Sequence, residues 1–157
     1  MLNQTEYLFS DSFYSLGPVL VVNQNSHATS LDEMEGKIIG IKEGSSSVYN
    51  VQHFHSILIL PYDNMVMALE DLNNDKIDGV IMDVWPAYAY IQSFYKGKLR
   101  VVTSPLIKEG LRLATLRQPE YVPLIDGFNE GLKELKKSGE YDDLLKRWGL
   151  FNTEITK

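Results

Sequence analysis

The sequence predicts an α/β fold built around a largely parallel sheet. Short apolar runs alternate along the chain with amphipathic stretches, and polar segments such as Asn23–Thr29 separate them. That alternation is typical of strands and helices stacked in layers. The chain has 157 residues, which fits one domain or one and a part, and its 44% of apolar residues can form a core.

The expected strands are all short and apolar. Gly17 and Pro18 mark the start of the first one, because these residue types commonly interrupt regular structure. A continuous apolar run of this length is typical of a strand buried on both faces. In chain order, the expected strands are Pro18–Val22, Lys37–Lys42, Ile57–Leu60, Ile77–Met82, Leu99–Val102 and Leu111–Leu116.

The expected helices combine cap residues with apolar side chains at helical spacing. Ser30 and Glu33 have the spacing of a capping box, and Gly36 would end that short helix. Asp63 would cap a helix that begins near Met65. Further helices are expected at Val48–His53, at Trp85–Tyr95, along a tail face made of Ile125, Phe128, Leu132 and Leu135, and around Leu144–Trp148 after a break at Ser138–Gly139.

The composition excludes several classes of protein. The 15 basic and 21 acidic residues give a net charge of −6 without any basic block, so nucleic acid is not an expected partner. The absence of cysteine excludes disulfides and thiolate chemistry. Apolar runs such as Val19–Val22 are far shorter than the roughly 20 residues of a spanning helix. The first residues have neither a basic nor an apolar stretch, so no secretion signal is expected in this chain.

The histidines do not predict a metal site or a catalytic group. No acidic residue stands beside His53 and His55 to complete a metal shell, and His27 is isolated, so all three are expected at the surface. The Gly-x-Ser-x-Gly elbow of a serine hydrolase is also missing, because Gly44 has no matching second glycine. No metal, cofactor or catalytic residue is therefore expected.

A serine-rich loop follows the second expected strand. Gly44, Ser45, Ser46 and Ser47 precede an expected helix, whose first N–H groups and positive dipole end would attract an anion. A single serine could simply cap that helix, which is common, but three exceed this need. The loop is a candidate site for a carboxylate or a phosphate, and it lacks the lysine of a nucleotide-binding P-loop.

Asp83 directly follows the apolar run Val80–Met82. A carboxylate at the carboxyl end of a strand can receive an ammonium group, although it can also cap the helix that follows. Ligands of open α/β sheets bind at the carboxyl ends of the strands, which would bring Asp83 and the serine loop together. The two features combined predict a site for a zwitterion such as an α-amino acid.

A recognisable pattern is carried by Phe9–Gly17, Leu31–Lys37, Ile39–Ser46, Ile77–Asp83 and Ser138–Gly149, which read FSDSFYSLG, LDEMEGK, IGIKEGSS, IDGVIMD and SGEYDDLLKRWG. In this order the segments resemble the family 3 extracellular solute-binding proteins, the amino-acid receptors of ABC importers. The similarity extends over nearly the whole chain. The pattern is most similar to receptors for glutamine and other polar amino acids.

The resemblance implies a type II periplasmic-binding-protein fold, in which two α/β lobes are joined by two hinge segments. Residues 1–22 would form a first-lobe remnant and the first hinge strand, and residues 23–109 a complete second lobe. Residues 110–157 would form the second hinge strand and the last first-lobe helices. Members of the family begin much earlier, so the first lobe would be incomplete here. The chain would be a fragment, a shortened relative, or completed by another chain.

The resemblance also assigns ligand contacts. The residue matching Asp83 takes the ligand's α-ammonium group, and the one matching Ser46 bonds the α-carboxylate mainly through its backbone amide. Lys42 holds a position that can contact the ligand's side chain, and Ser45 lines the same loop. The arginine that pairs with the α-carboxylate in the family has no counterpart, because Asn3 stands at its place.

The expected function is therefore the amino-acid-binding component of an ABC transporter, periplasmic or at the cell surface, with a permease as partner. Lys42 would repel a basic side chain, which favours a polar ligand such as glutamine. One alternative is a structural or sensory module that has lost its ligand. Another is a relative of cyclohexadienyl or arogenate dehydratases, for which no acid–base pair is visible. The apolar tail face would lack its sheet, so a homodimer with exchanged elements is expected.

Overall fold

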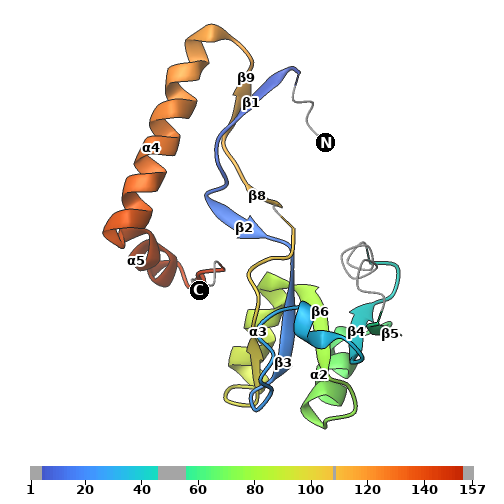
Figure 1. Ribbon diagram of the computed structural model, residues 1–157. Coiled ribbons are helices and arrows are strands. Elements are labelled where there is room, and N and C mark those ends of the chain that lie inside the picture. Colours follow the sequence, from blue (N-terminus) through green and yellow to red (C-terminus); the bar gives the residue numbers. More distant parts are fainter. Residues whose placement is uncertain (1–4, 46–55, 108, 154–157) are drawn as a thin grey trace. The chain divides into compact units, whose positions relative to one another are not determined.

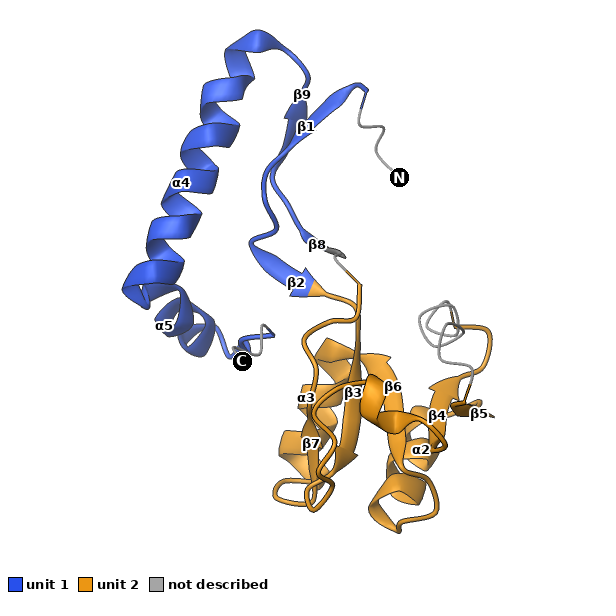
Figure 2. Ribbon diagram, viewed as in Figure 1, with its two compact units in different colours: residues 1–15, 109–153 blue, residues 16–108, 154–157 orange. Residues whose placement is uncertain are grey.

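The computed structural model describes residues 5–45, 56–107 and 109–153 of the chain (Figure 1). The chain forms two compact units (Figure 2): unit 1 comprises residues 1–15 and 109–153, and unit 2 comprises residues 16–108 and 154–157. Among the described residues, the chain passes from unit 1 to unit 2 at 15–16 and returns to unit 1 between 107 and 109. The expected helix Val48–His53 lies outside the described residues.

Unit 2 is built on a five-stranded sheet with the order β5-β4-β6-β3-β7. Its strands are β3 (Pro18–Asn23), β4 (Ile38–Lys42), β5 (Leu58–Tyr62), β6 (Gly79–Asp83) and β7 (Leu99–Val101). The sheet is mixed, since β4 runs parallel to β5 and β6, whereas β3 is antiparallel to β6 and β7. Four strands, β4, β5, β6 and β7, therefore run in one direction, as expected for a largely parallel sheet. The expectation is wrong for β3 alone, because an apolar run indicates burial but not strand direction.

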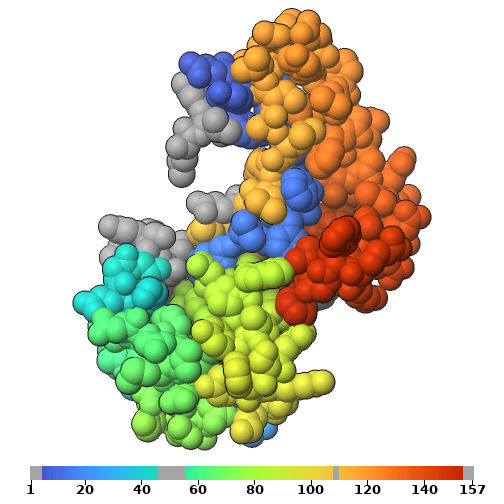
Figure 3. All heavy atoms as spheres, turned by 180° about the vertical axis from the view of Figure 1, so that it is seen from behind, coloured from blue at the N-terminus to red at the C-terminus, as the bar shows by residue number. Residues whose placement is uncertain are grey.

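Both faces of this sheet are covered. The covering elements are α2 (Met65–Asn73), α3 (Val84–Phe94) and the 3-10 helix η1 (Asp32–Met34). Helices α2 and α3 form much of the green and yellow-green surface of unit 2 in Figure 3. Successive strand residues point to opposite faces, so Val19 and Val21 pack with these two helices. Leu20 and Val22 pack on the other face with η1. The core of unit 2 is thus a double layer around β3 and β6.

The edge strand β5 differs from its expected burial. Leu58 is 59% exposed and Leu60 is 42% exposed, whereas Ile57, just before the strand, is buried. β5 has a hydrogen-bonded neighbour on one side only, which is β4. The expectation of a buried strand at Ile57–Leu60 is therefore wrong for the residues within β5.

Two caps differ from the expected ones by a single residue each. Helix α2 is capped by Asn64, whose side-chain oxygen accepts a hydrogen bond of 2.9 Å from the Val66 N–H, and not by Asp63. The expected helix after Ser30 is the 3-10 helix η1, and no side chain caps it. The Glu33 carboxylate instead accepts a hydrogen bond of 2.6 Å from the Thr29 N–H. The cap spacing predicts the location of a helix start but not the capping residue.

Unit 1 contains two small sheets and two helices. Its elements are β1 (Tyr7–Phe9), β2 (Tyr14–Leu16, whose last residue belongs to unit 2), β8 (Glu109–Leu111), β9 (Ala114–Leu116), the 3-10 helix η2 (Pro119–Tyr121), α4 (Val122–Ser138) and α5 (Glu140–Arg147). Strand β1 pairs with β9, and β2 pairs with β8. The single strand expected at Leu111–Leu116 is thus divided in two. At the division, the Leu113 N–H donates to the hydroxyl of buried Ser10.

The apolar face of the tail helix has partners inside unit 1. Ile125 and Leu132 on α4 are only 7% and 8% exposed. The ring of Phe128 meets that of Phe13 edge-on, with centroids 6.0 Å apart. The Tyr141 hydroxyl of α5 donates a hydrogen bond of 2.7 Å to the Phe13 carbonyl. The premise that this face lacks a partner is therefore wrong. No helix in the described part of the chain combines the length and apolar character needed to cross a bilayer.

We expect the folded protein to lose stability in alkali because of Tyr62, the last residue of β5. Burial first, then a hydrogen bond to Asp71 and the charge of that carboxylate, raise the pKa of Tyr62 to about 12. A folded-state pKa above the unfolded value of about 10 means that the folded state keeps a proton that the unfolded chain releases. The free energy of unfolding is therefore expected to fall as the pH rises from about 10 to about 12.

Tyr62→Phe is expected to reduce this alkaline loss, measured by urea unfolding at a series of pH values. It cannot remove all of it, because burial also raises the pKa of Tyr88 and Tyr95. Tyr121→Phe in unit 1 is the matched control. An equal pH dependence in the parent and in Tyr62→Phe would show that the Tyr62 proton does not contribute.

Candidate functional site

The candidate site lies at the carboxyl ends of two adjacent parallel strands. β4 ends at Lys42 and β6 ends at Asp83, and the pairing of Ile41 with Ile81 brings these ends together. A hollow of about 480 Å³ opens there, lined by Lys42, Ser45, Asp63, Asn64, Met65, Ile81, Met82, Asp83, Pro86 and Tyr90. Three of the four site residues expected from the sequence thus line one hollow. The fourth, Ser46, lies outside the described residues.

Asp83 lines this hollow at the end of β6. It is the last residue of β6 and stands at the N-cap position of α3, yet its side chain makes no capping hydrogen bond. Its exposed carboxylate has no hydrogen-bond or ion-pair partner within the described residues. The backbone is fixed nevertheless, because the Val84 N–H donates to the Gly17 carbonyl at 2.9 Å. The alternative in which the Asp83 side chain caps α3 is therefore wrong, and no described residue bonds to its carboxylate.

Lys42, which lines the same hollow, is held by a backbone carbonyl. Its ammonium group donates a hydrogen bond of 3.0 Å to the main-chain carbonyl of Asp63. The next residue, Glu43, donates its N–H to the Tyr62 carbonyl at 3.0 Å, which extends the pairing of β4 and β5. A hydrogen bond with the Asp63 carboxyl, and then repulsion between the two groups, raise the pKa of Glu43. The surroundings of Lys42 are therefore acidic.

Ser45 enters the hollow from a tight turn. Its N–H donates to the Lys42 carbonyl at 3.1 Å, and Gly44 inside the turn has a φ of 69°. This left-handed conformation strains most other residues, which explains a glycine at that position. The turn brings the half-buried Ser45 to the wall that Lys42 also lines. Anion binding by the serine loop stays a prediction.

A search of protein-family models finds no match. The chain is 28% identical over 149 residues to the putative ABC transporter arginine-binding protein 2 of Escherichia coli (strain K12), which covers 92% of this chain and 60% of that protein. It is 24% identical over 143 residues to the ABC transporter glutamine-binding protein GlnH of Bacillus subtilis (strain 168), covering 89% and 50%. The chain is a homologue of the amino-acid-binding proteins of ABC transporters.

Solved structures of such binding proteins share the fold. The second substrate-binding domain of a putative amino acid ABC transporter from Streptococcus pneumoniae matches with a TM-score of 0.59 and 26% identity, covering 91% of this chain and 65% of that one. The L-cystine solute receptor of Neisseria gonorrhoeae matches with a TM-score of 0.73 at 18% identity, covering 98% and 64%, which concerns the fold alone. The expected α/β fold of type II periplasmic binding proteins is confirmed. The chain spans about 60% of the length of the curated relatives.

The sequence interpretation of this homologue missed part of its candidate site. Asp63 was expected to cap a helix, and Tyr90 was not singled out within the expected helix Trp85–Tyr95, yet both line the hollow. The available signal for Asp63 was its place directly after a strand, which is the rule that selected Asp83. Tyr90 offered no such signal, because an aromatic residue on a helix is usually a packing residue.

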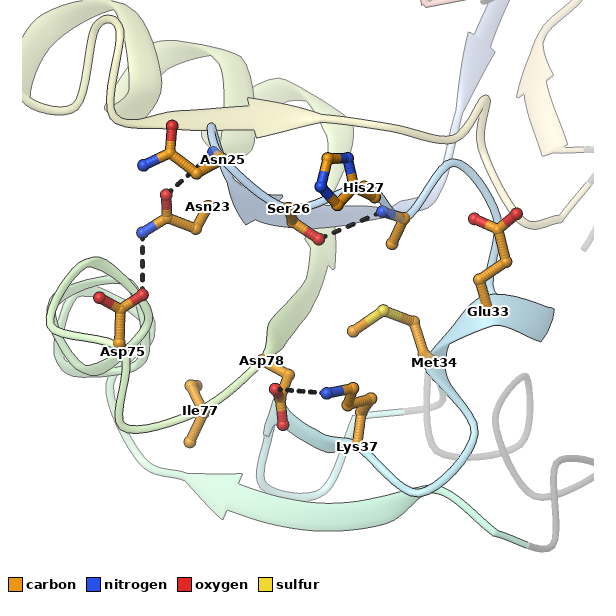
Figure 4. A pocket seen from close by; sticks show the side chains of 11 residues that line it. Asn23, Asn25, Ser26, His27, Glu33, Met34, Lys37, Asp75, Ile77 and Asp78 are labelled. Carbon is orange, nitrogen blue, oxygen red and sulfur yellow. Dashed lines mark hydrogen bonds and ion pairs between the residues drawn. The ribbon is translucent and has the colours of Figure 1, made fainter.

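A second hollow of about 680 Å³ lies at the opposite end of the same sheet (Figure 4). It is lined by Asn23, Asn25, Ser26, His27, Ala28, Glu33, Met34, Lys37, Asp75, Ile77 and Asp78. Most of its polar groups bond to each other: Asn23 donates to Asp75 at 3.1 Å, and Lys37 pairs with Asp78 at 3.5 Å. The smaller hollow is therefore the better candidate, because it lies at the carboxyl ends of the parallel strands and contains an unpartnered carboxylate.

Proposed function

We propose that this chain is the amino-acid-binding component of an ABC transporter and that it holds the α-ammonium group of a polar amino acid, such as glutamine, on Asp83. The observation that carries the proposal is the hollow that Lys42, Ser45 and Asp83 line together, with the Asp83 carboxylate unpartnered among the described residues. An ammonium group would form charge-assisted hydrogen bonds with that carboxylate. The ligand's α-carboxylate would bind at the loop of Ser45 and Ser46.

Two observations support a small polar ligand: the volume of the hollow and the amino acids for which the relatives are named. About 480 Å³ falls within the roughly 300–1,000 Å³ of ordinary small-molecule pockets. Relatives are named for arginine, glutamine and histidine. Solved structures of an ancestral arginine-binding protein hold glutamine in one case and arginine in another. A polar amino acid is therefore the ligand class that we propose for this chain.

We further propose that unit 2 corresponds to the second lobe, expected at residues 23–109, and that unit 1 belongs to the first lobe. Two passages between the units, at 15–16 and between 107 and 109, support the two hinge segments of the expected architecture. The proposed partner is a transporter permease. The proposed location is the periplasm or the cell surface, since one relative is a periplasmic protein of Escherichia coli and another an extracellular protein of Bacillus subtilis.

Isothermal titration calorimetry with glutamine, arginine, histidine and alanine tests the proposed function. Binding of at least one polar amino acid, more tightly than alanine, is expected. The absence of heat with every amino acid would favour the structural or sensory alternative. Turnover of prephenate or arogenate in a parallel assay would favour the dehydratase alternative. The relatives, which are named as binding proteins, give no support to that alternative.

We also propose that unit 1 mediates contact with a second copy of the chain. The tail-helix face is mostly packed, but other apolar side chains of unit 1 are open to solvent, namely Leu111, Leu116, Val122, Leu124 and Trp148. Exposed large apolar side chains on a small unit favour association. Light scattering after size-exclusion chromatography should give twice the chain mass of 17.9 kDa. A monomer at all concentrations would exclude the dimer.

A further inference from the structure

Asp63 is a second carboxylate in the proposed amino-acid site. It directly follows β5 and lines the same hollow as Asp83. Both aspartates are exposed, and Lys42 is the cationic side chain among the lining residues of this hollow. With two aspartates and one lysine, the lining therefore carries a net charge of −1.

Within the described residues, the carboxylate of Asp63 neither caps α2 nor forms an ion pair with Lys42. The cap of α2, which the sequence suggested for it, is provided by Asn64. Lys42 bonds to the main-chain carbonyl of Asp63 and forms no ion pair with its carboxylate. The carboxylate faces Glu43 instead, and this contact raises the pKa of Glu43. Two acidic groups in contact repel each other, so a hydrogen-bond donor placed beside them would be stabilised.

The position of Lys42 also removes the reason to expect rejection of basic ligands. Its ammonium group is held by a carbonyl oxygen at 3.0 Å and stands next to the carboxyl groups of Glu43 and Asp63. Nearby negative charges offset the field of the ammonium group at the ligand's side chain. The repulsion expected from the sequence is therefore compensated locally.

We propose that Asp63 is a specificity-determining residue, which accepts hydrogen bonds from an N–H group on the ligand's side chain and disfavours a side-chain carboxylate. The inference rests on the proposed function, because the same hollow must first hold the α-ammonium group on Asp83. Amide, guanidinium and ammonium ends all supply the N–H donor that a carboxylate needs. Glutamine and arginine then fit the site, and glutamate does not.

Calorimetric titration of the whole chain with arginine, glutamine and glutamate tests this selection. The parent is expected to bind arginine and glutamine more tightly than glutamate. Asp63→Asn should lower the ratio of arginine to glutamate affinity about fivefold or more, the size of a partly exposed charge-assisted hydrogen bond. Asp63→Ser provides a second removal of the charge, and thermal unfolding checks that both variants are folded.

Asp75→Asn is the matched control, because it removes the same charge from the other hollow of unit 2. It should leave the ratio unchanged. If Asp63→Asn and Asp63→Ser keep the ratio of the parent, or if the parent prefers glutamate, the role of Asp63 is refuted while amino-acid binding stands. If the parent binds none of these three amino acids, this inference fails, and if it also binds no histidine, the proposed function fails with it.

Discussion

Asp83→Asn is expected to weaken the binding of every amino acid ligand by about ten- to a hundredfold, which corresponds to the roughly 1.5–3 kcal/mol of hydrogen bonds to a charged group. The substitution keeps the shape of the side chain but removes the charge that would receive the ligand's ammonium group. Because that carboxylate makes no capping bond to α3, its loss should not disturb the helix. Calorimetry with glutamine and arginine measures the change.

The loss at Asp83 should be the same for all amino acids, because they share the α-ammonium group. This distinguishes Asp83 from Asp63, whose removal should change the order of preference. Asp32→Asn, an exposed aspartate of η1, is the control for net charge. Equal affinities of the parent and Asp83→Asn would show that the ammonium group binds elsewhere, and the zwitterion interpretation would then be abandoned.

The layered fold could be predicted from the sequence because its central strands are uniformly apolar. Val19–Val22 and Val80–Met82 are buried on both faces, and only a strand covered on both sides requires such runs. The direction of β3 was not predictable, since the same run suits a parallel and an antiparallel neighbour. β1 and β2 were missed because each has only three residues, too few for periodicity.

The candidate site was predictable as far as one physical rule reaches. Lys42 and Asp83 are the last residues of β4 and β6, Ser45 follows β4, and the parallel pairing of β4 with β6 brings these strand ends to one edge. The rule selected Asp83 and the serine loop, whereas Lys42 was selected by the family resemblance. Asp63 obeys the same rule, but the local cap signal outweighed it. The structure shows which interpretation of Asp63 is correct: Asn64 caps α2, and Asp63 lines the hollow. A cap motif can therefore draw attention away from a neighbouring residue that lines a hollow.

Leu20→Ala is expected to lower the free energy of unfolding of unit 2 by about 2–5 kcal/mol, the usual cost of truncating a buried leucine. Leu20 is fully buried at the centre of β3, within the apolar cluster that includes Val22, Ile39 and Ile81. Its side chain also lies against Gly79, where an added methyl group would come within 3.0 Å of it. The vacated volume cannot be filled by these strands, because their backbones are fixed by the ladder of the sheet.

The two tryptophans allow this loss to be assigned to one unit. Trp85 lies in unit 2 and Trp148 in unit 1, so Trp148→Phe and Trp85→Phe backgrounds report the units separately in urea titrations followed by fluorescence. Leu20→Ala should move the Trp85 transition by the full amount and the Trp148 transition much less. Leu58→Ala is the control, since that leucine is 59% exposed and should cost less than about 0.5 kcal/mol. A loss below about 1 kcal/mol at Trp85 would contradict the burial of Leu20, because it falls well under the range for a buried leucine.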